Sequence, residues 1–197
     1  MKFVKKSRSP WKTLGSREVY RNPWISVRED RVIQPDGRPS IYGVIEPRPY
    51  VGVIPFDERH VYLVRQWRYA CNENAWEIPT GGRDGKENAL KAAKRELAEE
   101  TGFSAKRWTW FGTLRELSAI STARGDFYLA EHLSAVPQRL EGAESDLVVK
   151  KILLSDALAW IDRRRITDGV SVAALLMLDR RLRNQPKKPN RPGRPRR

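Results

Sequence analysis

The stretch GGRDGKENALKAAKRELAEETGF, from Gly81 to Phe103, gives the clearest information on the fold. Apolar residues recur in it at the period of a helix, at Leu90, Ala93 and Leu97. This period predicts an amphipathic helix that begins near Lys86. The helix is expected to end at Gly102, because glycine readily adopts the left-handed conformation that closes a helix. One helix therefore carries most of the stretch.

Three glutamates, Glu96, Glu99 and Glu100, crowd onto one arc of this helix beside the apolar stripe. Like charges at this spacing destabilise an isolated helix by about 0.2–0.5 kcal/mol per pair. A divalent cation would turn this repulsion into attraction, because carboxylate oxygens suit Mg²⁺ or Mn²⁺ ions that share their coordination with phosphates. The cluster therefore indicates metal-dependent phosphate chemistry, and a solvated acidic helix face is the alternative.

The chain has a formal net charge of +14, and this charge lies at its two ends. Residues 1–12 contain five basic side chains and residues 180–197 contain nine, with no acidic residue in either segment. The other 24 basic residues balance the 24 acidic ones, so the body of the chain is formally neutral. We treat residues 1–15 as a basic segment. The Pro-, Arg- and Lys-rich residues 184–197 are expected to be disordered and to bind polyanions weakly.

Cysteine content and hydropathy exclude several classes of protein. Cys71 is the only cysteine, so neither an intramolecular disulfide nor a cysteine-based zinc site is possible. The first residues, MKFVKKSRSPWK, lack the apolar core of a signal peptide. The longest apolar run, Val170–Leu178, is too short to span a bilayer. We therefore expect a soluble, cytoplasmic protein with no membrane segment.

The chain upstream of the acidic helix has the pattern of short strands. Turn signals at NPW and QPDGRP divide residues 16–48 into an antiparallel sheet, which precedes a main domain at residues 49–183. Within that domain, two apolar strands, Val51–Phe56 and Val61–Gln66, flank a polar turn and predict a hairpin.

The chain downstream of the acidic helix predicts more strands and then two helices. The segments RWTWFGTLREL, GDFYLAEHL and LVVKKILL are rich in β-branched and aromatic residues, as strands are. We expect Ser155 or Asp156 to cap a helix that ends near Arg164. A last helix is expected at about Gly169–Leu182.

The spacing of residues from Gly81 to Phe103 resembles the Nudix box at all nine of its fixed positions. These positions are Gly81, Glu87, Arg95, Glu96, Leu97, Glu99, Glu100, Gly102 and Phe103. The resemblance identifies the chain as a member of the Nudix hydrolase family. It implies an α/β fold, the Nudix α/β/α sandwich with a mixed sheet, and divalent cations bound next to a diphosphate.

The resemblance also implies roles for individual residues. Glu96 and Glu100 would be the principal Mg²⁺ ligands, and Glu99 would be a further ligand or the general base. The backbone carbonyl of Thr80 or Gly81 would add another ligand. Two other positions of the box, Glu87 and Arg95, would orient the loop and helix by ion pairing.

The segments LVRQWRYA and WEIPTGG resemble the ADP-ribose and nucleoside diphosphate sugar pyrophosphatase branch of that family. Members of this branch are generally homodimers, and their N-terminal sheet exchanges across the two-fold axis. The resemblance therefore implies that residues 16–48 help to build the partner's site. Arg68 would bind the diphosphate through paired hydrogen bonds. An aromatic side chain would stack on the base, and four are available: Tyr20, Trp24, Tyr42 and Trp67.

A mobile acidic loop commonly supplies the catalytic base in this branch, and RLEGAESDL is the equivalent segment here. Glu144 is the first candidate and Glu141 the second. One departure concerns LSAIS, Leu117–Ser121, where ADP-ribose pyrophosphatases usually have a proline in a turn. Its absence favours a broader or different nucleoside diphosphate sugar, such as GDP-mannose.

The sequence thus predicts a Mg²⁺-dependent pyrophosphatase that converts a nucleoside diphosphate sugar to a nucleoside monophosphate and a sugar phosphate. An RNA 5′-end pyrophosphohydrolase of the same fold is one alternative, favoured by the basic C-terminal residues. A non-catalytic nucleotide-sensing module is the other, although the complete glutamate set argues against it.

Overall fold

The computed structural model describes residues 8–140 and 142–184 of the chain. Its central strands are β4 (Tyr50–Asp57) and β5 (His60–Arg68), which form the expected hairpin. Both strands bury apolar side chains at consecutive positions, for example Val61, Tyr62, Leu63 and Val64. Such runs are typical of strands that are covered on both faces.

These two strands belong to a seven-stranded sheet in the described part of the chain, in the order β10-β5-β4-β9-β8. In addition, β6 pairs with β5 and β7 pairs with β4. The other strands are β6 (Glu73–Glu77), β7 (Thr80–Gly82), β8 (Phe103–Leu114), β9 (Gly125–Ala135) and β10 (Val148–Leu153). The β4–β9 pair is parallel and the other pairs are antiparallel, so the predicted mixed sheet is confirmed.

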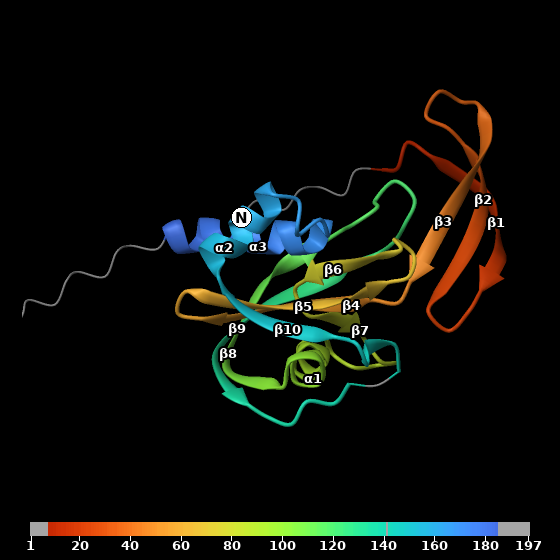
Figure 1. Cartoon of the computed structure of the whole chain (residues 1–197). Coiled ribbons are helices and arrows are strands. Elements are labelled where there is room, and N and C mark those ends of the chain that lie inside the picture. The colour runs from red at the N-terminus through yellow and green to blue at the C-terminus, as the bar shows by residue number, and fades with distance from the viewer. Residues whose placement is uncertain (1–7, 141, 185–197) are drawn as a thin grey trace, which may run out of the picture.

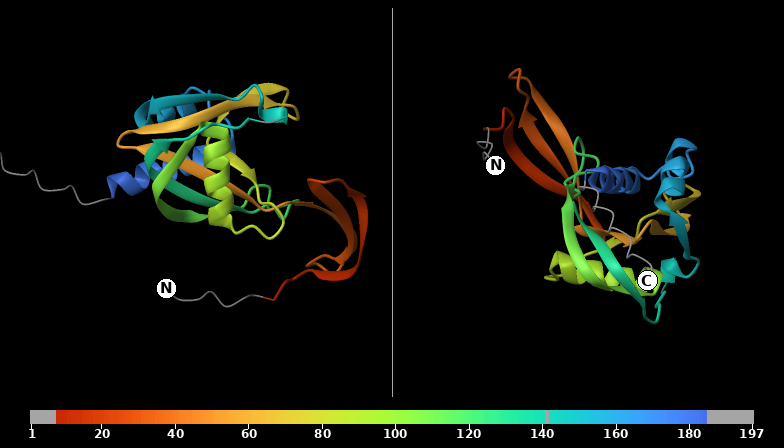
Figure 2. Two further views of the ribbon diagram at one scale, coloured as in Figure 1. Left: turned by 90° about the horizontal axis from the view of Figure 1, so that it is seen from below. Right: turned by 90° about the vertical axis from the view of Figure 1, so that its left-hand side faces the viewer.

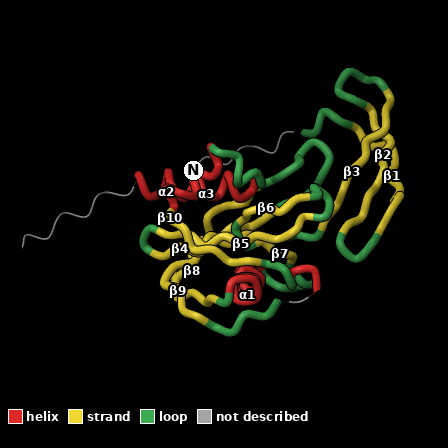
Figure 3. Tube along the Cα trace, in the orientation of Figure 1, coloured by secondary structure: helices red, strands yellow, loops and turns green. Residues whose placement is uncertain are grey.

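Helices cover both faces of this sheet (Figures 1 and 3). On one face, α1 (Ala89–Thr101) packs Ala93 and Leu97 against Val51 and Val53 of β4. On the other face, α2 (Leu154–Asp162) and α3 (Gly169–Arg183) enclose the larger apolar core. The expected α/β/α sandwich is therefore confirmed.

A separate three-stranded antiparallel sheet precedes the sandwich and stands beside it (Figures 1 and 2). Its strands are β1 (Lys12–Arg21), β2 (Ile25–Ile33) and β3 (Pro39–Pro47). The first strand begins at Lys12, before the expected boundary at Ser16. Six large apolar side chains in and around this sheet are exposed: Trp11, Leu14, Val19, Tyr20, Trp24 and Ile41.

The segment Leu117–Ser121 joins this N-terminal sheet to the sandwich. Ile45 of β3 donates its N–H to the carbonyl of Ile120 at 2.8 Å, and its own carbonyl accepts from Thr122 N–H at 3.0 Å. The hydroxyl of Tyr42 also donates to the carbonyl of Ala119. The segment that departs from the branch pattern therefore serves as a backbone-bonded support for β3.

The C-terminal end of α1 and the start of α3 lie where the sequence predicts them. Asn88 caps α1 by accepting Lys91 N–H at 2.8 Å, and Gly102 closes it in the left-handed conformation, as expected. The last helix, α3, begins at Gly169 as expected.

The expected cap of α2 at Ser155 or Asp156 is wrong. This helix starts at Leu154, directly after β10, and Leu153 at its N-cap makes no side-chain cap bond. The N–H of Leu154 instead donates to the carbonyl of Arg59 in the β4–β5 turn at 2.8 Å. No helix in residues 8–140 and 142–184 is long and apolar enough to cross a membrane.

Candidate active site

A cleft of about 730 Å³ opens at one end of the sandwich, where elements from all parts of the chain meet. The N-terminal sheet and its flanks contribute Trp24, Ile25, Pro47 and Arg48. The end of β5 contributes Arg68, and the following turn contributes Tyr69, Ala70 and Cys71. The remaining walls come from β4, β6, β7, α1, the start of α3 and the loops that follow β7 and β8. The cleft therefore collects side chains that are far apart in sequence.

Glu96 of α1 packs its carboxylate directly against Gly81 of β7. A Cβ atom at position 81 would overlap that carboxylate, so only glycine allows the approach. Glu96 is only 5% exposed. Burial raises its pKa to about 7, although the guanidinium of Arg95 acts in the opposite direction. The strand and the helix thus place an acidic group in contact with the backbone of the cleft wall.

Glu100 lies one helical turn further along α1 and is 1% exposed. Its Oε2 atom accepts the N–H of Thr80 at 3.2 Å. Its Oε1 atom is buried without a hydrogen-bond partner among the described residues. Burial raises its pKa to about 9, and the charges of Glu96 and Glu144 add to this effect. A buried carboxylate with an unpartnered oxygen requires either a proton or a cation.

Arg95 holds the acidic helix and the preceding loop together. Its guanidinium donates to Glu96 at 2.8 Å and to Glu99 at 2.9 Å. It also donates to the carbonyl of Gly82 at 2.8 Å and to Glu87 at 3.1 Å. One arginine therefore supplies positive charge among three of the glutamates and fixes both sides of the loop.

Residues 8–140 and 142–184 contain no group of three His, Cys, Asp or Glu side chains already arranged around one ion position. The guanidinium of Arg95 lies between the carboxylates of Glu96 and Glu99 instead. The donors nevertheless fit a hard divalent cation, because the buried carboxylate of Glu96 lines the cleft and the unpartnered oxygen of Glu100 lies one helical turn further along α1.

Arg68 and Glu77 form a partly buried ion pair in the same cleft. Arg68 Nε donates to both carboxylate oxygens of Glu77 at 3.0 Å, and a terminal nitrogen of Arg68 adds a further contact. Burial acts to lower the pKa of Arg68, but the hydrogen bond to Glu77 and the negative charges of Glu77, Glu100 and Asp168 together outweigh it, so the pKa is raised. The guanidinium is thus held charged and oriented by a carboxylate that is only 6% exposed.

Glu144 lies in a short 3₁₀ helix, η1 (Gly142–Glu144), and its charge acts on the glutamates of α1. Burial raises the pKa of Glu144, and repulsion from Glu99 adds to it. Glu144 in turn raises the pKa of Glu96 and of Glu100. The charges of Glu144 and of the α1 glutamates therefore act on one another. Glu141, the second candidate base, lies outside the described residues.

Two family models match adjoining parts of the chain. The nucleoside diphosphate sugar hydrolase N-terminal domain matches residues 11–45, which form the N-terminal sheet. The NUDIX domain matches residues 46–157, more than half of the chain. The chain belongs to the Nudix family. The family identified from the Gly81–Phe103 spacing is thereby confirmed, and the protein is a Nudix hydrolase.

Individual Nudix relatives cover nearly the whole chain. The ADP-ribose pyrophosphatase of Bacillus subtilis (strain 168) is 29% identical over 175 residues, covering 85% of this chain and 91% of the relative. The ADP-ribose pyrophosphatase of Mycobacterium tuberculosis is 26% identical over 170 residues, covering 84% and 82%. A crystal structure described as an ADP compounds hydrolase superposes with a TM-score of 0.78 at 23% identity, covering 91% of this chain and 97% of that one. This structural likeness confirms the fold.

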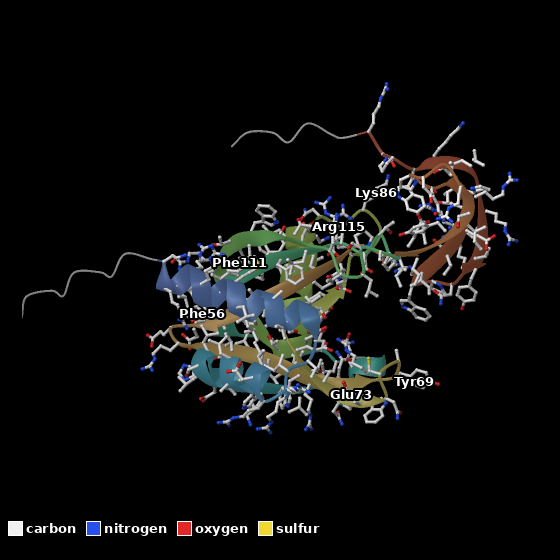
Figure 4. All side chains as sticks on the ribbon, turned by 90° about the horizontal axis from the view of Figure 1, so that it is seen from above. Phe56, Tyr69, Glu73, Lys86, Phe111 and Arg115 are labelled. Carbon is white, nitrogen blue, oxygen red and sulfur yellow. The ribbon has the colours of Figure 1, made fainter. Side chains whose placement is uncertain are left out.

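The aromatic candidates are distributed unevenly around this Nudix cleft. Trp24 lines it and is 68% exposed. Trp67 and Tyr20 are exposed, but they are not among the described residues that line the cleft. Tyr42 is engaged with the Leu117–Ser121 segment. The turn after β5 instead brings Tyr69 to the rim, where it projects into solvent (Figure 4).

Several residues that line the cleft had no role assigned from the sequence: Tyr50, Glu77, Glu116 and Asp168. Glu77 carried a usable signal, because a single glutamate in the apolar run AWEIP must find a partner when the run is buried. Asp168 also carried one, since it precedes the last helix and caps it. Tyr50 and Glu116 reach the cleft through tertiary packing and had no local signal.

Proposed function

We propose that this chain is a divalent-cation-dependent pyrophosphatase that hydrolyses nucleoside diphosphate sugars. The observation that carries the proposal is the occurrence of both charge types in one cleft. Glu96 lines the cleft with a buried carboxylate for a cation, Glu100 adds a second buried carboxylate one helical turn away, and Arg68 supplies a fixed guanidinium for a phosphate. Hydrolysis would break one P–O bond of the diphosphate and add water across it, giving a nucleoside monophosphate and a sugar phosphate.

Mg²⁺, or Mn²⁺ in its place, would be held by Glu96 and Glu100, with Glu99 and a backbone carbonyl of Thr80 or Gly81 as additional ligands. When bound, the cation would neutralise the diphosphate and lower the pKa of the attacking water. Both carboxylates are held in position without the cation, because Gly81 leaves room for the carboxylate of Glu96 and Thr80 N–H donates to Glu100.

Arg68 would bind a non-bridging oxygen pair of the diphosphate, for which a planar guanidinium is suited. Glu77 keeps that guanidinium in place before substrate arrives. Trp24 is the aromatic side chain of choice for stacking on the base, because it lines the cleft and exposes its ring. Trp67 and Tyr20 could serve only if a second subunit or a movement brought them to the cleft.

Glu144 is our candidate for the group that takes the proton from water. Its raised pKa keeps it a stronger base than an ordinary glutamate, and its charge acts on Glu96 and Glu100. Glu141 and Glu99 are the remaining candidates, but Arg95 already holds Glu99 at 2.9 Å. A proton acceptor engaged by a guanidinium is a weaker base, so the order is Glu144, Glu141 and then Glu99.

The names of the relatives support ADP-ribose as one substrate, since two of them are ADP-ribose pyrophosphatases. The Leu117–Ser121 segment lacks the proline turn typical of such enzymes and bonds to β3. We therefore include GDP-mannose and similar nucleoside diphosphate sugars among the candidate substrates.

We also propose that the protein is a cytoplasmic homodimer. The three-stranded sheet, whose strands span Lys12 to Pro47, exposes Tyr20, Ile41 and, in its first turn, Trp24 in the single chain. Apolar groups exposed together are typical of a surface that another chain covers. Residues 49–183 would form the catalytic domain, with the basic segments at residues 1–15 and 184–197 outside it.

The decisive experiment assays purified full-length protein with Mg²⁺ on ADP-ribose, GDP-mannose, other nucleoside diphosphate sugars, dinucleotides and 5′-triphosphorylated RNA. The Glu100→Gln variant is the matched control, because it keeps the shape of the side chain and removes the charge. Turnover of a nucleoside diphosphate sugar that depends on Glu100 supports the proposal. Preference for the RNA would indicate a 5′-end pyrophosphohydrolase, and no turnover of any compound would indicate a sensing module.

A further inference from the structure

Five basic residues and two tryptophans gather on the α2 side of the sheet. We call this group the basic surface, and its members are Arg65, Trp76, Lys150, Trp160, Arg163, Arg164 and Arg165. They come from β5, β6, β10 and the C-terminal end of α2, which lies over that side of the sheet opposite α1 (Figure 1). Arg163, Arg164 and Arg165 are all exposed.

The two indole rings hold the basic groups in place. Trp76 and Trp160 are half-buried, and their ring centroids are 5.5 Å apart. The guanidinium of Arg65 lies 5.5 Å from the centroid of Trp76. Lys150 and Arg165 lie over Trp160, at 5.5 Å and 4.5 Å. Such cation–π contacts order the cations while leaving their charge available to a partner.

The positive charge of this surface is not balanced by the rest of the molecule. Across residues 8–140 and 142–184, none of its five basic residues forms an ion pair, whereas neighbouring Lys151 pairs with Asp57 at 2.8 Å. The nearby carboxylates on α2 are Asp156 and Asp162, and both are exposed. Arg65 Nε is buried without a hydrogen-bond partner among the described residues.

Arg164 occupies a position where glycine would suit the backbone better. The helix α2 ends with Arg164 N–H donating to the carbonyl of Ile161 at 2.9 Å and Arg165 N–H donating to that of Trp160 at 2.8 Å. This pattern requires a left-handed residue, and Arg164 has a φ of 55°. A side chain with a Cβ is strained there. The arginine at this position therefore costs folding stability, and a role in ligand binding would account for that cost.

The basic surface and the cleft lie on different faces of the same strand. Trp76 and Glu77 are consecutive in β6, so their side chains point to opposite faces of the sheet. Glu77 lines the cleft, and Trp76 packs against α2. A ligand on the basic surface can thus bind without entering the cleft.

We propose that the basic surface binds the backbone of single-stranded RNA. Repeated phosphates match a cluster of cations, three of which are held over indole rings, and such a guanidinium can also stack on a base. A lipid surface fits less well, because both indoles are half-buried and Val148, the exposed apolar side chain opposite Arg65, is short. Arginine and tryptophan are also frequent at the centres of protein interfaces, so binding of an acidic protein is the competing outcome, which the comparison with polyglutamate tests. This activity goes beyond the hydrolysis proposed above.

The test measures fluorescence anisotropy of a labelled single-stranded RNA of about 12 nucleotides, a length typical of single-strand sites. The RNA carries a 5′-hydroxyl, so it offers no diphosphate to the cleft. Full-length protein should bind it, with affinity falling roughly a hundredfold between about 50 and 200 mM salt, as expected for five contacts. The variant Arg164→Gly/Arg165→Ala should bind about tenfold more weakly, with a log–log salt slope shallower by about 1.4.

The matched control is Lys94→Ala/Lys106→Ala, which removes the same charge from exposed positions on α1 and β8. Its affinity should stay within about twofold of the natural chain, because its lysines lie outside the basic surface. Hydrolysis of ADP-ribose should be the same in Arg164→Gly/Arg165→Ala as in the natural chain. The anisotropy assay therefore tests RNA binding and the ADP-ribose assay tests the proposed hydrolysis, so that either can fail without the other.

Arg164→Gly alone separates a ligand role from a structural one. It should raise the melting temperature, because glycine relieves the strained φ, while RNA binding becomes weaker. A higher melting temperature with unchanged RNA binding would overturn the proposal. Unchanged binding in the double variant would assign binding to another basic segment and overturn it as well. Tighter binding to phosphatidylserine vesicles or to polyglutamate than to RNA, at equal charge, would also reject it.

Discussion

The carboxylate of Glu96 and the backbone of Gly81 are in direct contact, and no side chain larger than hydrogen fits between them. This contact aligns α1 with β7 at the floor of the cleft. The metal ligands proposed for this chain therefore depend on a residue that has no chemical group of its own.

The substitution Gly81→Ala should displace Glu96 and weaken Mg²⁺ binding. The added methyl overlaps the carboxylate, and overpacking of this kind costs about 1–3 kcal/mol of stability. The measurement is the rise in melting temperature on adding Mg²⁺ or Mn²⁺, which should shrink in the variant. Gly82→Ala is the control, because a Cβ there meets nothing within 4 Å. An equal loss of the metal effect in both variants would show that the contact with Glu96 is not the cause.

The pH dependence of stability should reveal the buried glutamates. Burial raises the pKa of Glu96 to about 7 and of Glu100 to about 9, above the value of 4.5 for an exposed glutamate. A raised pKa in the folded state gives stability that is present below 4.5 and lost as the pH rises through the folded value. The metal-free protein should therefore lose stability between about pH 5 and 9.

Glu100→Gln should flatten this pH profile, because the neutral amide no longer ionises. Mg²⁺ should restore stability to the natural chain most strongly at high pH, since the cation competes with protons for the same carboxylates. Both effects are measured by melting curves from pH 5 to 9 with and without metal. A pH-independent metal effect would contradict the assignment of Glu96 and Glu100 as ligands. The variant should also lose more than about 100-fold in turnover.

Arg68 should bind phosphate through the geometry of its guanidinium rather than through charge alone. Arg68→Lys keeps the charge but loses the planar fork, so we expect KM for a nucleoside diphosphate sugar to rise about tenfold. Arg65→Lys is the control, because Arg65 lies on the same strand and outside the cleft. Steady-state kinetics on both variants would test this. A fall in kcat with unchanged KM would argue against a binding role.

The fold and the acidic helix could be predicted because their signals are local. The helical period of Leu90, Ala93 and Leu97 and the glycine at position 102 lie within one stretch of chain. The sequence signal for strand β6 is weaker, because its five residues, ENAWE, show no clear alternation of apolar and polar side chains. Such a short segment becomes a strand because it pairs with β5.

Other parts of the site could not be predicted, because they depend on contacts between distant segments. The ring of Tyr50 reaches the cleft wall only because Gly125 has no side chain to obstruct it. The guanidinium of Arg95 donates to the carbonyl of Gly82 at 2.8 Å, on the far side of the loop that precedes α1. The order of residues along the chain does not show that this loop folds back onto the helix.

Ser171 should stabilise the cleft from inside α3. Its hydroxyl accepts the buried N–H of Ile78 at 2.9 Å, and Asp168 in turn accepts both the hydroxyl and the N–H of Ser171 at 2.7 Å. Ser171→Ala would leave the Ile78 N–H without a partner, at a cost of about 1–3 kcal/mol. Because Ile78 follows Glu77, kcat/KM should fall together with the melting temperature.

Ser155→Ala is the matched control for Ser171→Ala. Ser155 is exposed and does not cap α2, so its loss should change stability by less than about 0.5 kcal/mol. Thermal unfolding of both variants and kinetics at a temperature where both are folded make the comparison. Equal stability of the two variants would show that the Ile78 bond is replaceable by water. A destabilised Ser171→Ala enzyme with natural kcat/KM would restrict Ser171 to holding the fold, whereas loss of both would place α3 among the elements that position Glu77 and, through it, Arg68.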